Sequence, residues 1–183
     1  NRASQRALEL APDLAEAHFG MADLLERGGR EQEAVPAFKA AVAANPTFIA
    51  AQLRLADALR RTDQLEESLS HYRQVIALEP ADLAARFGEA MALVRLDRYA
   101  EARDRLAEGL TVHPEQAIFR QALARILAAA PDEGVRDGER AWKLVEAISK
   151  EQAHPGAFET LAMVLAELGH FDLALDWQRL AMS

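Results

Sequence analysis

The fold is decided by residues 15–48, AEAHFGMADLLERGGREQEAVPAFKAAVAANPTF. This stretch predicts a helix, a tight turn at Gly28-Gly29 and a second helix that ends before Pro46, because glycine and proline mark helix boundaries. The same pattern returns twice, in windows whose final prolines are spaced 34 residues apart: residues 49–82 and 83–116, with Pro46, Pro80 and Pro114. The chain is therefore predicted to be a repeat array, an architecture typical of binding scaffolds.

Each repeat alternates small and large apolar residues at fixed positions. In the predicted first helices a small residue is followed three positions later by leucine: Ala22, Ala56, Ala90, Ala124 and Ala162, then Leu25, Leu59, Leu93, Leu127 and Leu165. In the second helices the small residues are Ala34, Ser68, Ala102, Ala141 and Ala174. A small residue lets two helices approach closely, and the large one fills the space beside it. At these positions the sequence resembles the tetratricopeptide repeat (TPR) family, whose unit is a 34-residue helix-turn-helix.

The resemblance implies an all-α, right-handed superhelical solenoid of antiparallel helix pairs that forms one domain over residues 1–183. The expected units are a partial repeat, three regular repeats, a fourth with a loop insertion and an incomplete fifth: residues 1–14, 15–48, 49–82, 83–116, 117–154 and 155–183. In the partial repeat, Ala7 and Leu8 precede Pro12 as Ala41 and Val42 precede Pro46. We therefore expect a helix that ends near Pro12 and belongs to a longer array. The alternative is a lone N-terminal cap helix.

In TPR arrays the first helices line a concave groove, and the resemblance transfers that role to one face of this chain. The expected groove residues are Phe19, Asp23, Leu53, Arg54, Asp57, Phe87, Met91, Arg95, Gln121 and Arg125. Gly20 and Gly88 would widen the groove for a ligand side chain. The alternative is an unused face whose apolar residues only support neighbouring helices.

Composition argues against several other functions. The formal net charge of -8 disfavours general nucleic-acid binding, and the absence of cysteine excludes disulfides and thiolate metal sites. No apolar run is long enough for a membrane span. The histidines lack metal-ligand spacing, and no phosphate-binding loop or nucleophile motif is present. We therefore expect neither an enzyme nor a cofactor, and the preference for arginine over lysine together with abundant alanine hints at a bacterial source.

Several local features depart from the repeat. Pro36 is expected in the first turn of its helix, where proline is tolerated, and Asp63 has the spacing of a capping residue before Glu66. Glu89 takes a position where other repeats have Met21, Leu55, Leu123 and Leu161. It requires either an arginine partner, for which Arg54, Arg86 and Arg120 are candidates, or a local rearrangement that lets it reach water.

The predicted turn of the fourth repeat, residues 131–138, is longer than the others by about five residues, and Asp137 is placed to cap the next helix. It resembles a turn of bacterial TPR segments in envelope or cofactor-bearing proteins. The alternative is a purely structural loop held by salt bridges and an Asp cap. The last helix lacks the polar helix that usually closes an array, so Leu175 and Leu180 are expected to be exposed.

Two functions follow from the resemblance. The first is a non-catalytic scaffold that binds a partner peptide or helix in the groove, within a larger bacterial assembly. The second is an accessory segment of a multidomain enzyme or electron-transfer protein whose catalytic domain lies outside these residues. The sequence leaves the compartment open between cytoplasm and periplasm, with a lean toward the envelope.

Overall fold

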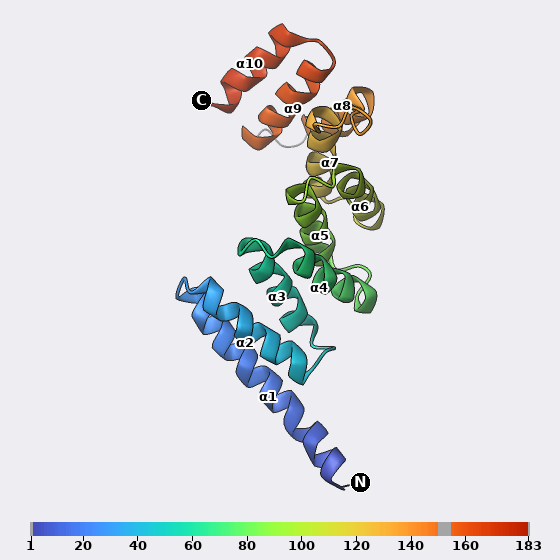
Figure 1. The fold of residues 1–183 in the computed structure, drawn as a ribbon. Helices are drawn as coiled ribbons and strands as arrows, with labels where there is room; N and C mark the ends of the chain where they lie inside the picture. Colours follow the sequence, from blue (N-terminus) through green and yellow to red (C-terminus); the bar gives the residue numbers. More distant parts are fainter. Residues whose placement is uncertain (1, 150–154, 183) are drawn as a thin grey trace. The chain divides into compact units, whose positions relative to one another are not determined.

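The computed structural model describes residues 2–149 and 155–182, which form helices joined by turns (Figure 1). The helices of this part of the chain are α1 Arg2–Arg27, α2 Glu31–Ala44, α3 Ile49–Arg61, α4 Leu65–Leu78, α5 Leu83–Arg95, α6 Tyr99–Val112, α7 Ala117–Ala129, α8 Gly138–Ser149, α9 Pro155–Glu167 and α10 Phe171–Ala181. The predicted all-α solenoid of helix pairs is confirmed. None of the described helices combines the length and the apolar character that a membrane span requires.

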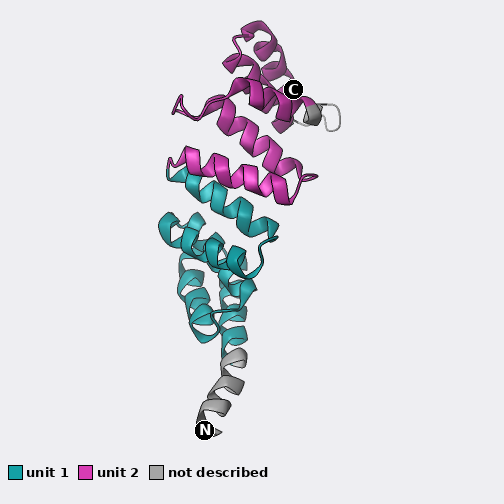
Figure 2. Ribbon diagram, turned by 90° about the vertical axis from the view of Figure 1, so that its right-hand side faces the viewer, with its two compact units in different colours: residues 1–96 teal, residues 97–183 magenta. Residues whose placement is uncertain are grey.

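The contacts divide the chain into two compact units, residues 1–96 and residues 97–183 (Figure 2). In the first unit α1 packs on α2, α2 on α3, α3 on α4 and α4 on α5. In the second unit α7 packs on both α6 and α8, and α9 on α7, α8 and α10. Each helix therefore buries its apolar face mainly against its neighbours along the chain, which is the local packing expected of repeats.

The small and large positions of the repeat form the core. In the first unit Ala22, Ala34, Phe38, Leu55 and Leu59 are fully buried and lie in one cluster. The second unit buries the equivalent set: Ala102, Leu106, Leu123, Ala124 and Leu127. The spacing of small and large residues thus identified these core residues correctly, whereas Leu25 is only partly buried.

The short turns share one backbone requirement. The second residue of each three-residue turn has a positive φ, between 57° and 80°: Gly29, Asp63, Asp97 and Gly169. Glycine reaches this left-handed region without strain, and aspartate tolerates it better than most residues. The requirement places Asp63 inside the turn, so the predicted capping box is wrong. The residue before α4 is Gln64, which makes no side-chain capping bond.

Two expectations about proline are also wrong. α1 runs without interruption from Arg2 to Arg27, so no helix ends at Pro12, in contrast to α2, α4 and α6, which stop before Pro46, Pro80 and Pro114. The side chains of residues 2–13, Leu8 among them, lie outside the described part. Pro36 sits beyond the first turn, because α2 already begins at Glu31. The helix therefore lacks one hydrogen bond that a residue with an N–H would donate there.

The connection between α7 and α8 spans residues 130–137 and is held by its own polar contacts. The Arg136 guanidinium pairs with Glu133 and with Glu167 of α9, each at 3.1 Å, and donates to the carbonyl of Ala130. Asp137 accepts from the Arg140 N–H at 2.9 Å, as predicted for a cap. These contacts match the structural alternative for this loop.

Candidate functional site

The predicted groove residues lie on the first helices of the pairs, α1, α3, α5 and α7. Eight belong to the first unit, and we call this set the groove face: Phe19, Asp23, Leu53, Arg54, Asp57, Phe87, Met91 and Arg95. All eight retain some exposure to solvent. Gln121 and Arg125 belong to the second unit and are described separately below.

Phe19 is only partly a surface residue. Its ring lies 5.8 Å from the ring of Phe38 and 5.2 Å from that of Phe48, in tilted geometry. Phe38 is fully buried, so Phe19 forms the edge of the core cluster. This agrees with the alternative in which an apolar residue of the face supports neighbouring helices. Leu53 and Phe87, at the equivalent positions of α3 and α5, are half-buried.

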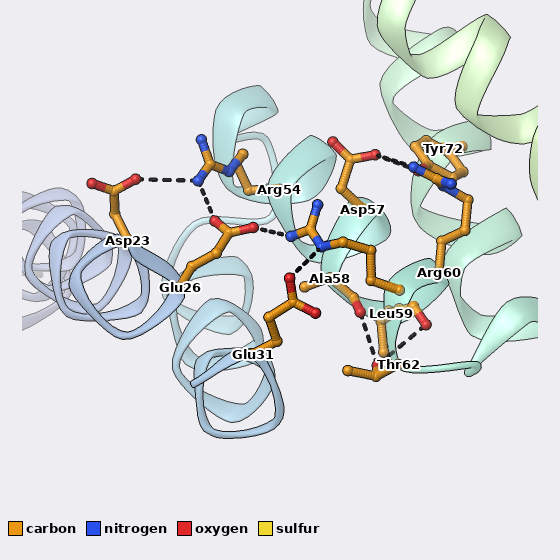
Figure 3. A network of polar contacts seen from close by, with 11 residues as sticks. Asp23, Glu26, Glu31, Arg54, Asp57, Ala58, Leu59, Arg60, Thr62 and Tyr72 are labelled. Atoms are coloured by element: carbon orange, nitrogen blue, oxygen red, sulfur yellow. Dashed lines mark hydrogen bonds and ion pairs between the residues drawn. The ribbon is translucent and has the colours of Figure 1, made fainter. Parts of the chain in front are cut away.

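A network of ion pairs joins α1, α2 and α3 along the groove face (Figure 3). The carboxylate of Glu26 contacts the guanidinium groups of both Arg54 and Arg61. Arg54 also pairs with Asp23 at 3.2 Å, and Arg61 pairs with Glu31 of α2 at 3.0 Å. The charges predicted to flank a ligand are therefore already paired within the protein.

Three members of this network, Glu26, Glu31 and Arg61, were not predicted from the sequence. Glu26 lies three residues after Asp23 and Arg61 lies seven after Arg54, spacings that put each on the same helix face as its predecessor. The helical period was thus a sufficient signal for both. The family resemblance supplied only the groove positions, and these three residues lie outside them.

Asp57 belongs to a second polar cluster, which includes a buried tyrosine of α4 (Figure 3). The Tyr72 hydroxyl donates to Asp57 Oδ1 at 2.5 Å and accepts from Arg60 Nε at 3.0 Å. Burial and the hydrogen bond to Asp57 together raise the pKa of Tyr72. The cluster fixes the carboxylate of Asp57 on the groove face.

Gly88 does not widen the groove as predicted. A Cβ at this position would lie 2.4 Å from Cε1 of Tyr72, so the ring of Tyr72 fills the space. Gly20, the equivalent residue of α1, has no heavy atom within 4 Å of its Cβ position and is open. The equivalent residue of α3 is Arg54, whose guanidinium lies 6.0 Å from the ring centre of Phe38.

Arg95 is the last residue of α5 and the last member of the groove face in the sequence. Its guanidinium pairs with Asp63 of the α3–α4 turn at 2.8 Å and donates to the carbonyl of Arg60. Arg95 thus links α5 to the C-terminal end of α3, and Arg54 links α3 to α1 in the same way. The first helices of the first unit are therefore connected in series by arginines.

Glu89 is buried and pairs with Arg73 of α4, Nε to Oε1 at 2.8 Å. None of the three arginines named from the sequence is its partner, and the side chain does not turn out to water. Arg73 was missed because it lies on the second helix of the preceding repeat, whereas the candidates were taken from first helices. The contact has the geometry of a structural ion pair.

In the second unit the same kind of link joins α7 and α9. Gln121 Nε2 donates to the carbonyl of Gly156 at 2.7 Å, and Arg125 lies 3.8 Å from Glu159. Among the side chains that the structure describes, no cluster of three His, Asp or Glu residues could hold a metal ion.

Family models and solved structures both support the assignment of the chain as a repeat protein. Two family models, both described as tetratricopeptide repeat, match residues 1–47 and 63–126, together more than half of the chain. No curated protein matches.

Among solved structures, MamA 41-end from Desulfovibrio magneticus RS-1 matches with a TM-score of 0.80 at 15% identity, covering 93% of this chain and 94% of that one. A thermophilic TPR protein of Thermus thermophilus matches with a TM-score of 0.67 at 19% identity, covering 92% and 90%. A Podospora anserina putative kinesin light chain with nearly identical TPR-like repeats matches with a TM-score of 0.74 at 20% identity, covering 93% of this chain and 94% of that one. Such low identities establish the fold alone. Taken with the two family models, they show that this chain belongs to the tetratricopeptide repeat family.

Proposed function

We propose that this protein is a non-catalytic scaffold that binds a partner peptide, extended or helical, on the groove face of its first unit. One observation carries the proposal: the charged groups of that face already have partners within the protein, while Leu53, Phe87 and Met91 stay half-buried. A partner side chain could complete the burial of these apolar groups without breaking an ion pair. Gln121 and Arg125 of α7 are the corresponding binding residues of the second unit.

The pairing of charges also sets the expected chemistry of the ligand. Because Arg54 and Arg95 already contact carboxylates, a strongly acidic peptide would have to compete with Asp23, Glu26 and Asp63. The preferred ligand is therefore a peptide with spaced apolar side chains and little net charge. Its affinity should depend only weakly on ionic strength, since few new ion pairs form.

The proposal has two further parts, a place in a bacterial assembly and a second contact surface. The resemblance of residues 131–138 to a turn of bacterial TPR segments supports a place in a bacterial assembly. The apolar residues exposed on the terminal helices support a second kind of contact, outside the groove face.

Peptides selected from a display library against the whole chain test the groove. Leu53→Ala combined with Phe87→Ala should weaken binding of a selected peptide by at least about tenfold, as truncation of central contacts does. The matched control is Leu78→Ala, which truncates an exposed leucine of α4 outside the groove face. Peptides that bind the double variant and the control equally well would show that the groove face is not the site.

The free energies of unfolding of leucine-to-alanine variants distinguish core positions from positions on the groove face. Leu59→Ala and Leu93→Ala remove fully buried side chains and should lower the free energy of unfolding by about 2–5 kcal/mol. Leu53→Ala should lower it by about 1 kcal/mol, the usual cost of a less buried site. Equal losses at Leu53 and Leu59 would assign the apolar part of the face to the core. Phe19 is unsuited to this test because its ring already packs on Phe38.

A further inference from the structure

A hollow of about 430 Å³ lies on the second unit, where the N-terminal halves of α8 and α10 meet the end of α9. These three helices follow one another in the chain (Figure 1). The side chains that line the hollow are Glu139, Trp142, Leu165, Leu168, His170 and Leu173. We call it the corner hollow. It is separate from the groove face, which belongs to the first unit.

Leu173 of α10 departs from the repeat by being apolar. The residue just before the small position of each second helix is charged in four units and leucine in α10: Glu33, Glu67, Glu101, Arg140 and Leu173. The side chain of Glu67 is 41% exposed and pairs with Lys39 of α2 at 2.8 Å, so this position faces water also between two central helix pairs. The 53% exposure of Leu173 is therefore a property of its position in the repeat and not of its nearness to the end of the chain.

Trp142 of α8 departs from the repeat by being exposed. Val35 and Leu69 occupy its position in α2 and α4 and are 5% and 1% exposed, because the following first helix packs on them. The following first helix α9 packs on α8 in the same way, yet Trp142 remains 36% exposed. Part of the indole ring therefore lies in the corner hollow instead of under α9.

The corner hollow also lies apart from residues 150–154, which are outside the described part. Those residues connect the C-terminal end of α8 with the N-terminal end of α9. Glu139 is in the first turn of α8 and Leu168 directly follows the last residue of α9. The hollow is thus at the opposite ends of both helices.

A further repeat packed after α10 would use a different surface. Phe171 and Leu175 of α10 occupy the positions of Leu65 and Leu69, which are buried where α4 packs on α5. They line a separate hollow with residues of α9. Leu173 lies between them in the sequence and so points to another side of the helix.

Glu139 brings an unpaired carboxylate to the corner hollow. It is exposed and forms no ion pair with another described side chain, although Lys143 stands four residues later on the same helix. By contrast, Glu31 in the first turn of α2 pairs with Arg61 at 3.0 Å. Arg140 and Lys143 are not among the lining residues. The formal net charge of -8 favours the approach of a cation to this carboxylate.

We propose that the corner hollow binds an arginine side chain of a partner protein. The guanidinium lies against Trp142 and Glu139, and the aliphatic stem packs on Leu168 and Leu173. A guanidinium is planar and weakly hydrated, stacks on an indole ring and pairs with a carboxylate, so it satisfies both groups at once. An acidic side chain would be repelled by Glu139, and a wholly apolar one would leave the carboxylate without a partner. The proposal does not rest on the groove face.

Parallel selections from one random peptide display library test the proposal. One selection uses the unmodified chain and the other uses the double variant Glu139→Gln, Trp142→Leu. Peptides recovered with the unmodified chain alone should share an essential arginine. Replacing that arginine by citrulline, which has a similar shape without the charge, should weaken binding by at least about tenfold, because the ion pair and the cation–π contact are both lost. Replacement by lysine, which keeps the charge, should weaken binding less than citrulline does.

Intrinsic fluorescence locates the bound peptide on the chain. The protein has two tryptophans, and Trp177 packs on Phe158 with the ring centres 5.4 Å apart, outside the lining of the hollow. Trp177→Phe therefore leaves Trp142 as the only tryptophan, and a selected peptide should change its emission. Glu16→Gln makes the same change of net charge on an exposed residue of α1 and should leave the affinity unchanged.

The helical circular dichroism of each variant should match that of the unmodified chain, and Glu139→Gln alone repeats the test at an exposed residue. The double variant Leu53→Ala, Phe87→Ala should bind the selected peptides with unchanged affinity, which separates this site from the groove face. Selected peptides without arginine, equal affinity of the arginine and citrulline forms, or an absence of peptides that depend on Glu139 and Trp142 would overturn the proposal. Self-association of the chain that the double variant Glu139→Gln, Trp142→Leu abolishes would also overturn it, and would assign the hollow to a second copy.

Discussion

The ring of Tyr72 on α4 occupies the space that a side chain at Gly88 on α5 would need, with Cε1 2.4 Å from the position of a Cβ. Tyr72 is fully buried and its hydroxyl is held by Asp57 and Arg60, so the ring cannot move aside without losing those bonds. At this point of the contact between α4 and α5, position 88 therefore requires glycine.

Gly88→Ala should therefore destabilise the protein, although alanine favours a helix. The gain in helix propensity is about 1 kcal/mol, and overpacking a buried site costs about 1–3 kcal/mol. The expected net loss is about 1 kcal/mol, measured by urea unfolding. Adding Tyr72→Leu, which reproduces the Leu106 of the next repeat, should reduce the loss caused by Gly88→Ala.

Gly20→Ala is the matched control, because the same residue of α1 has open space around it. This substitution should stabilise the protein by about 0.5–1 kcal/mol. A loss of stability at Gly20 as large as that at Gly88 would contradict the steric explanation.

The Arg73–Glu89 ion pair predicts an asymmetric response to mutation. Arg73→Ala would leave the carboxylate of Glu89 buried without its partner and should cost about 1–2 kcal/mol, less than a fully buried pair because half of the Arg73 side chain is exposed. Glu89→Leu restores the residue that α3 and α7 have at this position and should be neutral or stabilising. Both free energies follow from urea unfolding at neutral pH, and the double variant should resemble Glu89→Leu alone. A large loss for Glu89→Leu would show that the carboxylate is needed for more than pairing with Arg73.

The buried hydroxyl of Tyr72 predicts a loss of stability in alkali. Burial and Asp57 raise the pKa of Tyr72 in the folded protein, whereas the unfolded chain ionises near its ordinary pKa of about 10. The stabilising contribution is therefore complete below pH 10 and is lost as pH rises above it, because only the unfolded state releases the proton there.

Unfolding midpoints between pH 8 and 11 measure this contribution. Tyr72→Phe should lower the free energy of unfolding at pH 8 by about 1 kcal/mol, since Asp57 and Arg60 lose a shared partner, and should flatten the decline above pH 10. Tyr99→Phe removes the second of the two tyrosines and serves as the comparison. The hydrogen bond to Asp97 raises the pKa of Tyr99 too, but this residue is partly exposed, so its substitution should flatten the decline less than Tyr72→Phe does. An unchanged alkaline decline in the Tyr72 variant would assign the effect to other groups.

The repeat pattern was sufficient for the fold because helix length, turn position and core all follow from spacing. The small and large positions became the core, and prolines such as Pro46 ended helices where expected. Pro12 was misread because a helix can continue through a proline when the chain around it favours the helical conformation. Asp63 was misread because its pattern fits both a cap and a left-handed turn residue, and only the backbone φ distinguishes them.

The groove face was harder to predict from sequence. Its positions came from the family resemblance. Whether each residue is paired, covered or open to solvent depends on contacts between repeats. The pairing of Arg54 with Glu26, the filling of Gly88 by Tyr72 and the link from Glu89 to Arg73 all join residues on different helices. Spacing along the chain predicts which residues share a helix face, whereas it does not tell which long side chain bridges to the next helix.

Repeat packing makes a final prediction about local stability. α10 has Ala174 as its one buried residue, whereas α4 buries Leu65, Ser68, Leu69, Tyr72 and Val75. Each helix of a solenoid is stabilised mainly by its neighbours, so opening of α10 should cost much less free energy than opening of α4. Native-state hydrogen exchange of the monomer should accordingly be fastest in α10 and slow in α3 and α4. Protection of α10 equal to that of α4 in the monomer would mean that its apolar face is stabilised by contacts other than those of the repeat.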